Sequence, residues 1–342
     1  MKSLITLFAL SFIALHAHAA ATKPFDTTAD MTTASREYVG VDDLQNLKGV
    51  KRVAIPSFEV EFVVRSNASS KTIDSEGSAR VQVFYNLRGA ETELMQQIVD
   101  KLYADTVADL VASGIEVLPY SAVEAAPSYA KLQGKWLKPS PLEEKTMDGM
   151  SRFIAPAGMP LYFYVDDKRL NVKSQFGAAF NMAVRPQVIE KDLAKELDAA
   201  MLRVRIVVLF ADMKANKGIL GDYAKISAKV DTRLGLALLP KETQFTFITP
   251  TGRAAVELTR PILAPDPFIT EVNDITTRGK KAAEAAGNAL SVLAAFGGAG
   301  GVHTSKSRDY DAVTTPDVYR AVVDKNLTAL RQMFMARVKP AL

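Results

Sequence analysis

A strand, a helix and a second strand follow one another closely between residues 51 and 118, and this succession constrains the fold most. Residues 53–55 form a short apolar run and residues 58–64 alternate, as in strands that are first buried and then half-buried. The next segment, 90–113, places apolar side chains at about a 3.6-residue period, at Leu94, Ile98, Leu102, Val107, Leu110 and Val111. Gly114 ends this helix before a strand over 115–118. This order predicts an α/β layer in which one helix face packs on a sheet.

The second half of the chain is richer in strand patterns. Apolar or alternating runs predict strands at 161–165, 202–210, 224–239, 244–248 and 254–258. The turn residues at 249–252 join the last two and favour a meander of antiparallel strands. The fold class that follows is α/β (α+β): a mixed sheet flanked by helices, with an antiparallel meander in the second half.

Further helices are expected at 121–133, 187–200, 274–296 and 315–338. Ser121, Asp274 and Thr315 are the expected N-caps of the first, third and fourth of them. Pro316 follows Thr315, and a proline is favoured at the first helical position because its missing N–H has no helical partner there. Glycines at 297–301 end the third helix.

Three polar segments are expected to lack regular structure. Residues 22–48 read as an extended or partly disordered lead-in, and 65–78 as the long loop of a hairpin. Residues 133–160, with the only tryptophan, Trp136, read as a long ordered loop or a junction. The expected domains are a signal peptide (1–19), a flexible lead-in (20–50) and an α/β globular region (51–342). Two subdomains joined near 133–160 remain an open alternative.

The first segment of the chain has the features of a cleaved secretory signal. Lys2 precedes an apolar stretch from Leu4 to Leu15, and Ala17 and Ala19 stand at the spacing of a cleavage site. The stretch is shorter than the ~20 residues that cross a bilayer as a helix. We therefore expect export to the periplasm with cleavage near Ala19.

Composition excludes several classes of function. The chain has no cysteine, which excludes disulfides, thiolate metal sites, cysteine nucleophiles and lipidation of an amino-terminal cysteine. Its histidines are His16, His18 and His303, and cleavage leaves only His303. A site with several histidine ligands is therefore excluded in the mature chain. The formal net charge of +4 is too small to indicate nucleic-acid binding.

The glycine-rich segment 297–307 does not match a nucleotide-binding motif. Ser305 stands where a Walker motif has glycine before its lysine, and His303 stands where a dinucleotide motif has its third glycine. The segment is expected to be a flexible loop after a helix. His303 with Asp309 or Asp311, and with Ser305 or Ser307, resembles a catalytic triad in residue types only, because neighbours on a loop seldom converge.

Two carboxylate pairs are the remaining candidates for catalysis. Asp166 with Asp167, and Glu143 with Glu144, are suited to bind a hard cation or to act as acid and base. Adjacent residues on a strand point to opposite faces, which argues against a shared ion and favours solvated charges. A carboxylate-dependent hydrolase is the weakest of the functional alternatives.

A basic cluster, Arg278, Lys280 and Lys281, leads into an alanine-rich helix. Ala282, Ala286 and Gly287 are small enough for another backbone to approach closely. Segment 282–302 therefore either packs inside the protein, docks a partner or touches a membrane.

The order of elements resembles an exported α/β unit. The segments that carry the resemblance are KRVAIP at 51–56, the helix at 91–113 running into IEVLPYSAVEA, SAKVDTRLGLA at 227–237, TPTGRAAVEL at 249–258 and the closing TPDVYRAVVDKNLTALRQM. Similar units occur in the curli secretion channel family, the penicillin-binding-protein activator lipoproteins, a flagellar assembly protein and the amino-terminal domain of TolB. This resemblance implies a periplasmic protein of Gram-negative bacteria that binds partners or assembles, without catalysis. The channel and activator families are lipoproteins, whereas this chain has no cysteine to acylate.

The sequence thus predicts a soluble periplasmic binding or assembly accessory of the cell envelope, without catalytic activity. Its expected partner is an envelope protein or a second copy of itself, and we expect no nucleic acid, nucleotide, cofactor or metal. No catalytic, cofactor-binding or metal-binding residue is assigned. The alternative is a homo-oligomeric, channel-like protein that contacts the outer membrane through 65–78 or 282–302.

Overall fold

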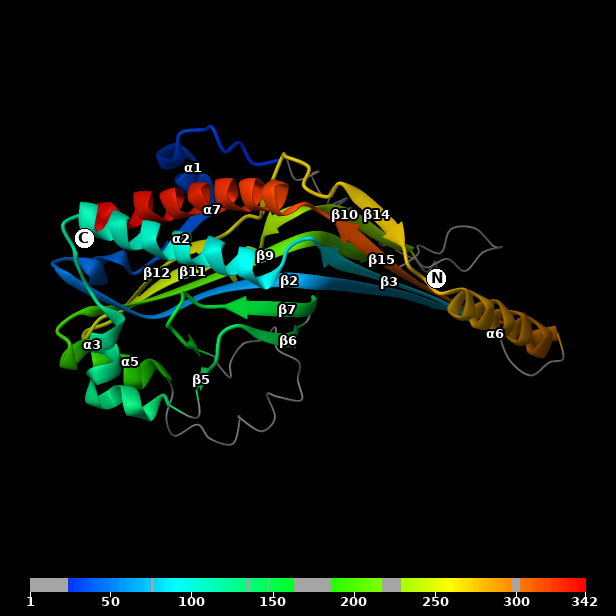
Figure 1. Ribbon diagram of the computed structural model, residues 1–342, viewed down its shortest axis with the longest axis horizontal. Coiled ribbons are helices and arrows are strands. Elements are labelled where there is room, and N and C mark those ends of the chain that lie inside the picture. Colours follow the sequence, from blue (N-terminus) through cyan, green and yellow to red (C-terminus); the bar gives the residue numbers. More distant parts are fainter. Residues whose placement is uncertain are drawn as a thin grey trace, which may run out of the picture.

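A single mixed sheet forms the centre of the protein, and helices cover both of its faces. The computed structural model describes residues 24–74, 77–133, 136–146, 148–162, 186–216, 229–296 and 302–342. The main path of strands is β1-β12-β11-β9-β2-β3-β15-β14. Helices α2 and α7 lie over one face, and α3 and α5 lie on the other side (Figure 1). The predicted α/β class with a mixed, helix-flanked sheet is confirmed.

The central strands explain why the first strand–helix–strand succession constrains the fold. β2 (Arg52–Asp74) pairs in parallel with β9 (Ala200–Asn216) and with β4 (Glu116–Leu118). Between β3 and β4 the chain forms α2 (Thr92–Ala112), whose apolar face is buried on the sheet. Gly114 adopts a φ of 82°, which only glycine adopts at little cost, so the helix ends there as predicted.

The second half contains the predicted antiparallel strands. β10 (Lys229–Leu238) and β11 (Gln244–Ile248) both pair antiparallel with β9, and β11 pairs antiparallel with β12 (Arg253–Leu258). β11 and β12 are neighbours joined by the turn at 249–252, but β10 and β11 are not neighbours and pair with successive stretches of β9. β13 (Ile262–Leu263) pairs antiparallel with β10. Because β11 and β12 are buried on both faces, they read as apolar runs and were predictable from the sequence.

Helix α7 (Pro316–Val338) closes the main core. The Thr315 hydroxyl accepts a hydrogen bond from the Val318 N–H, as expected of its N-cap. Leu327, Leu330 and Phe334 are fully buried, and the Phe334 ring packs edge-on against Phe245 of β11 at 5.0 Å. Helix η3 (Lys339–Ala341) follows directly.

A smaller core lies on the other face of the sheet. It joins α3 (Tyr120–Ala125), η2 (Pro127–Lys131) and α5 (Pro186–Glu196), with Trp136 buried among them. The expectation that Ser121 caps α3 is wrong, because the helix begins at Tyr120 and Pro119 occupies the N-cap position.

Two segments expected to lack regular structure contain it. Within 22–48 the chain forms α1 (Met31–Tyr38), β1 (Val39–Asp42) and η1 (Leu44–Leu47), and Leu47 is fully buried. Within 133–160 it forms β5 (Leu137–Lys138), β6 (Leu142–Thr146) and β7 (Gly149–Ile154), and β8 (Leu161–Tyr162) follows. Two of these strands have partners that are distant in sequence: β1 pairs with β12, and β7 pairs with β2. Local pattern alone does not reveal such pairings.

The largest correction concerns the segment 65–78, because its described residues, 65–74 and 77–78, belong to strands and not to a loop. β2 continues to Asp74, and β3 (Gly77–Arg88) returns beside it. β15 (Val302–Val313) pairs in parallel with β3 along its whole length, and β14 (Glu271–Asp274) pairs with the end of β15. Helix α6 (Arg278–Phe296) lies along β15. These elements, from Arg65 onward in β2, form an arm that projects from the body with α6 at its far end (Figure 1).

Candidate interaction surface

Helix α6 differs from the other long helices in how it is attached. From Arg278 to Ser291 its side chains are exposed or half-buried, and none belongs to either hydrophobic core. Leu290 leaves 66 % of its surface exposed. By contrast, α2 and α7 bury long apolar rows. Apolar burial therefore does not hold this part of α6 in place.

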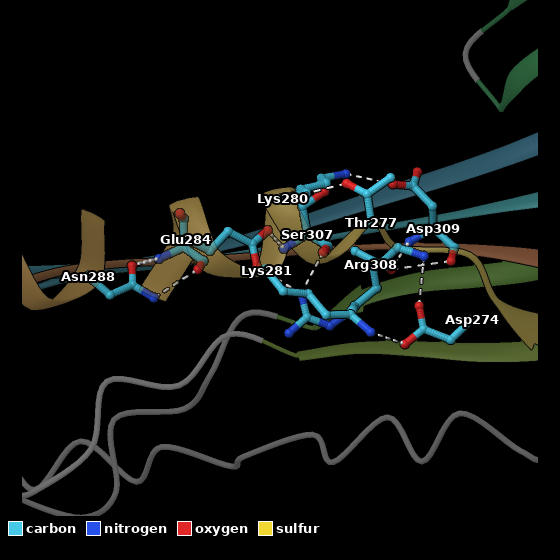
Figure 2. Close-up of polar contacts among 11 residues, drawn as sticks. Asp274, Thr277, Lys280, Lys281, Glu284, Asn288, Ser307, Arg308 and Asp309 are labelled. Carbon is cyan, nitrogen blue, oxygen red and sulfur yellow. Dashed lines mark hydrogen bonds and ion pairs between the residues drawn. The ribbon is translucent and has the colours of Figure 1, made fainter. Parts of the chain in front are cut away.

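The attachment consists of polar side chains that contact the backbone of β15. The N–H of Ser307 donates to Glu284 Oε1 at 2.6 Å, and the N–H of Ser305 donates to Asn288 Oδ1 at 2.8 Å. Asn288 Nδ2 donates back to the Ser305 carbonyl at 3.1 Å. Ser291 Oγ accepts from the next alternate N–H of β15, that of residue 303. Figure 2 shows Glu284 and Asn288 reaching the strand from one side of the helix.

Helical and strand spacing explain why these contacts repeat. Four residues of α-helix rise ~6 Å, and two residues of a strand rise ~6.6 Å. Side chains four apart on α6 therefore meet N–H groups two apart on β15, with helix and strand antiparallel. Nearer the body, Thr276 Oγ1 accepts from the Asp309 N–H at 2.9 Å, where the backbone pairing with β14 ends. Side chains thus continue the ladder that β14 begins.

Ion pairs run along the same line of contact between α6 and β15, which is called the seam below. Arg308 contacts Glu284 at 2.7 Å, Lys280 contacts Asp309 at 2.6 Å, and Lys281 contacts Asp274 at 2.8 Å (Figure 2). The hydrogen bond from Lys281, followed by those from Thr276, holds the pKa of Asp274 below its usual value. Hydrogen bonds of this kind contribute ~0.5–1.5 kcal/mol each, and exposed ion pairs ~0–1 kcal/mol. The seam is therefore specific in register and modest in stability.

One aromatic ring connects the seam to the face of the arm. Arg65 and Lys280 lie 5.0 and 5.6 Å from the centre of the Phe84 ring. Asp309 contacts both cations, at 3.7 Å from Arg65 and 2.6 Å from Lys280. Cations near an aromatic face are attracted by its quadrupole. The first turn of α6 is consequently fixed to the sheet more firmly than the rest of its described length.

His303 lies on strand β15 and not in a flexible loop, so that expectation is wrong for residues 302–307. Its Nδ1 is 2.9 Å from the Ser78 hydroxyl on the neighbouring strand, and its side chain is exposed. Alternation places Ser305, Ser307, Asp309 and Asp311 on the same face as His303. Asp309 is six residues from His303, or ~20 Å along the strand, which excludes a triad of these residues. Glycines 297–301 lie outside the described residues.

The carboxylate pairs do not form a site within the described chain. Glu143 and Glu144 are adjacent and exposed on β6, and Glu143 forms an ion pair with Arg152. Asp166 and Asp167 lie outside the described residues. Over that same described part, no group of three or more histidine and carboxylate side chains is placed to hold a metal ion.

Sequence reasoning missed a cluster of buried charges under the central strands. Glu61 is fully buried, accepts from the Ser151 hydroxyl at 2.7 Å and lies 3.5 Å from Arg205. Glu190, also fully buried, lies 3.3 Å from Arg203. The pattern over 58–64 predicts a half-buried strand, whereas Glu59 and Glu61 of this strand are both buried. Acidic residues alternate with apolar ones in β2, and arginines do so in β9. These opposite charges indicate that the two strands are neighbours, but the pattern can be recognised only once their pairing is known.

Comparison with known proteins adds no relative. No family model, no curated protein and no solved structure matches the chain. Among the helices of the described residues, none is long and apolar enough to span a membrane. The fold and the arm that carries α6 and β15 are therefore the features from which a function is proposed below.

Proposed function

We propose that this protein is a periplasmic accessory of the cell envelope that binds a partner or assembles with it, and that it is not an enzyme. The single observation that carries the proposal is the arm, which presents a helix with an exposed apolar side at the end of a long sheet. The secretory features of residues 1–19 support the periplasmic location.

Exposed apolar side chains concentrate on this arm. Of the six most exposed large apolar residues in the described chain, Val272, Ile275 and Leu290 lie on β14, on α6 or between them. The side of α6 away from β15 adds the exposed residues Ala282 and Ala286. Exposed apolar side chains that gather on one part of a protein are typical of an interaction site. On the body most large apolar residues belong to two cores, and the exposed ones, Val41, Val111 and Val188, lie on separate elements.

Site-specific photo-crosslinking in intact cells tests the proposal. A benzophenone amino acid in place of Leu290 is expected to give one discrete, saturable product. Val111, an apolar residue on α2 with 56 % of its surface exposed, is the matched control position and is expected to give none. Equal labelling from both positions, or no product from position 290, contradicts the proposal. Turnover of an envelope substrate that a single point mutation abolishes contradicts the absence of catalysis.

The alternative is a homo-oligomeric, channel-like protein associated with the outer membrane. It is favoured by the projection of the arm and by β3, where residues 81–87 are half-buried on both faces (Figure 1). Light scattering coupled to size exclusion is expected to show a ring-sized oligomer in this case, and liposomes of outer-membrane lipids are expected to co-sediment with the protein. A monomer that never associates with such liposomes excludes it.

A further inference from the structure

We propose that α6 is a displaceable guard of the β15 edge, and that this edge accepts an extended acidic segment of the partner as an added antiparallel strand. The inference rests on the proposed binding function and names the surface and the chemistry of the partner. It is carried by the contacts between α6 and the outer edge of β15.

The edge of β15 that α6 covers has no strand partner from 303 to 307 within the described chain, so another strand is able to pair there once α6 is displaced. β15 pairs with β3 on one side, and on its other side β14 pairs only with the residues from Tyr310 to Val313. From 303 to 307 the outward N–H groups are satisfied by the side chains of α6. An unpaired strand edge is a ready template for another strand. A strand added at residues 303–307 runs antiparallel to β15, as β14 does.

Helix α6 imitates a strand incompletely. A strand both accepts and donates at each alternate residue of the edge. Among the α6 side chains, Asn288 does both, toward Ser305. Glu284 and Ser291 accept and do not donate to the edge backbone. A true strand therefore forms more hydrogen bonds to β15 than α6 does, and no buried apolar contact of residues 278–291 opposes the exchange.

The charges on β15 define the chemistry of the incoming segment. Lys306 and Arg308 share one face of the strand because they alternate. Glu284 neutralises Arg308 while α6 is in place, and Lys306 is exposed with no hydrogen bond or ion pair in the described chain. When α6 is displaced, Lys306 and Arg308 lie two residues apart on one face of β15, and Arg308 has lost its contact with Glu284. An added strand satisfies them with two carboxylates spaced two residues apart, and small polar residues fit beside Ser305 and Ser307 on the other face.

The test measures binding of a synthetic probe to the mature chain, residues 20–342. The probe is an octapeptide of alternating Thr and Glu. Controls are an octapeptide of alternating Thr and Lys, and the Thr–Glu peptide interrupted by proline, which cannot pair along an edge. Fluorescence anisotropy gives the affinity, and hydrogen exchange of the amides of His303, Ser305 and Ser307 reports whether α6 is displaced.

Asn288→Ala is the variant that loosens the guard, and Arg278→Ala is its matched control on the same helix. Alanine favours helix, so Asn288→Ala removes the edge contact without melting α6. Because binding requires the open edge, the variant is expected to bind the Thr–Glu peptide about ten-fold more tightly than the parent protein. Arg278→Ala is expected to bind as the parent does.

Arg308→Glu separates opening from recognition. The new carboxylate repels Glu284, so exchange at Ser307 is expected to become faster, while the Thr–Glu peptide no longer binds and the Thr–Lys peptide does. The inference is overturned if neither peptide binds any variant, if the proline peptide binds equally, or if Asn288→Ala leaves the affinity unchanged. In each case a crosslink from Leu290 still leaves the proposed binding function standing, so the two failures are distinguishable.

Discussion

At the scale of single residues, burial decides which charges matter. The Arg205–Glu61 pair lies inside the protein, whereas the Arg253–Asp42 pair, at 2.6 Å, lies on the surface. Although its charged atoms are closer together, the Arg253–Asp42 pair contributes less to stability, because water screens exposed charges. Removing one partner of a buried pair leaves a charge that water does not solvate.

Arg205→Met is therefore expected to lower the free energy of unfolding by ~3 kcal/mol, because it takes a cation from the fully buried Glu61. Arg253→Met, the surface control, is expected to cost ~0–1 kcal/mol. Urea denaturation followed by circular dichroism measures both. Equal effects of the two variants would show that Arg205 does not stabilise Glu61.

A second prediction at this scale concerns pH. The pKa of Asp274 lies below its usual value, so its carboxylate stabilises the fold above the ordinary pKa of ~3.8 and loses that contribution as pH falls through the lowered value. An NMR titration of the Asp274 carboxyl is expected to place its midpoint below 3.8, and Lys281→Ala is expected to raise it. An unchanged midpoint in that variant would mean that the Lys281 contact does not form in solution.

At the scale of elements, two helices of similar length have different roles. α7 is capped by Thr315 and buried in the core, whereas α6 lies on the outside of the arm. The hydroxyl of Thr277 accepts from the Lys280 N–H at 3.2 Å at the start of α6. This contact replaces the expected cap, Asp274, which lies in β14 and accepts from Thr276 instead.

Removing each cap separates these roles. Thr315→Ala is expected to lower the global free energy of unfolding by ~1 kcal/mol. Thr277→Ala is expected to leave the melting temperature unchanged and to speed hydrogen exchange within α6 alone, because α6 opens locally. Calorimetry and hydrogen exchange measured by mass spectrometry check the pair. A global loss of stability from Thr277→Ala would show that α6 unfolds together with the body.

Elements with an apolar period were predictable from sequence, and the arm was not. α2 and α7 bury one regular stripe, and β11 and β12 are largely apolar. The arm strands from 65 to 74 and 302 to 309 are polar, since neither packs in the main core, so they carry no hydrophobic pattern. Their pairing depends on backbone hydrogen bonds between segments as distant as Ser78 and His303. The α6–β15 seam joins residues only 12 to 23 apart, and its 284, 288, 291 spacing is visible in the sequence, but it could not be recognised because 302–307 was not expected to be a strand.

At the scale of the whole molecule, stability is expected to fall from the body toward the arm. Within β2, residues 53–63 are buried, whereas Arg65, Asn67 and Ser69 are exposed. Hydrogen exchange is therefore expected to be slow at 53–63, with opening that requires global unfolding, and faster at 65–71 of the same strand. Uniform protection along β2 would show that the arm and the body unfold as one unit.

The continuity of β2 has a mechanical consequence. A strand of 23 residues spans about 75 Å and runs without a break from the body into the arm. A pull along the arm therefore loads the rungs between β2 and β9 in shear, so that many hydrogen bonds resist together. The α6 seam runs along the free edge of β15 and consists of a few polar contacts, with no buried apolar packing of residues 278–291 behind them. Under tension, the contacts between α6 and β15 at the tip of the arm are therefore expected to break before the pairing of β2 with β9 in the body.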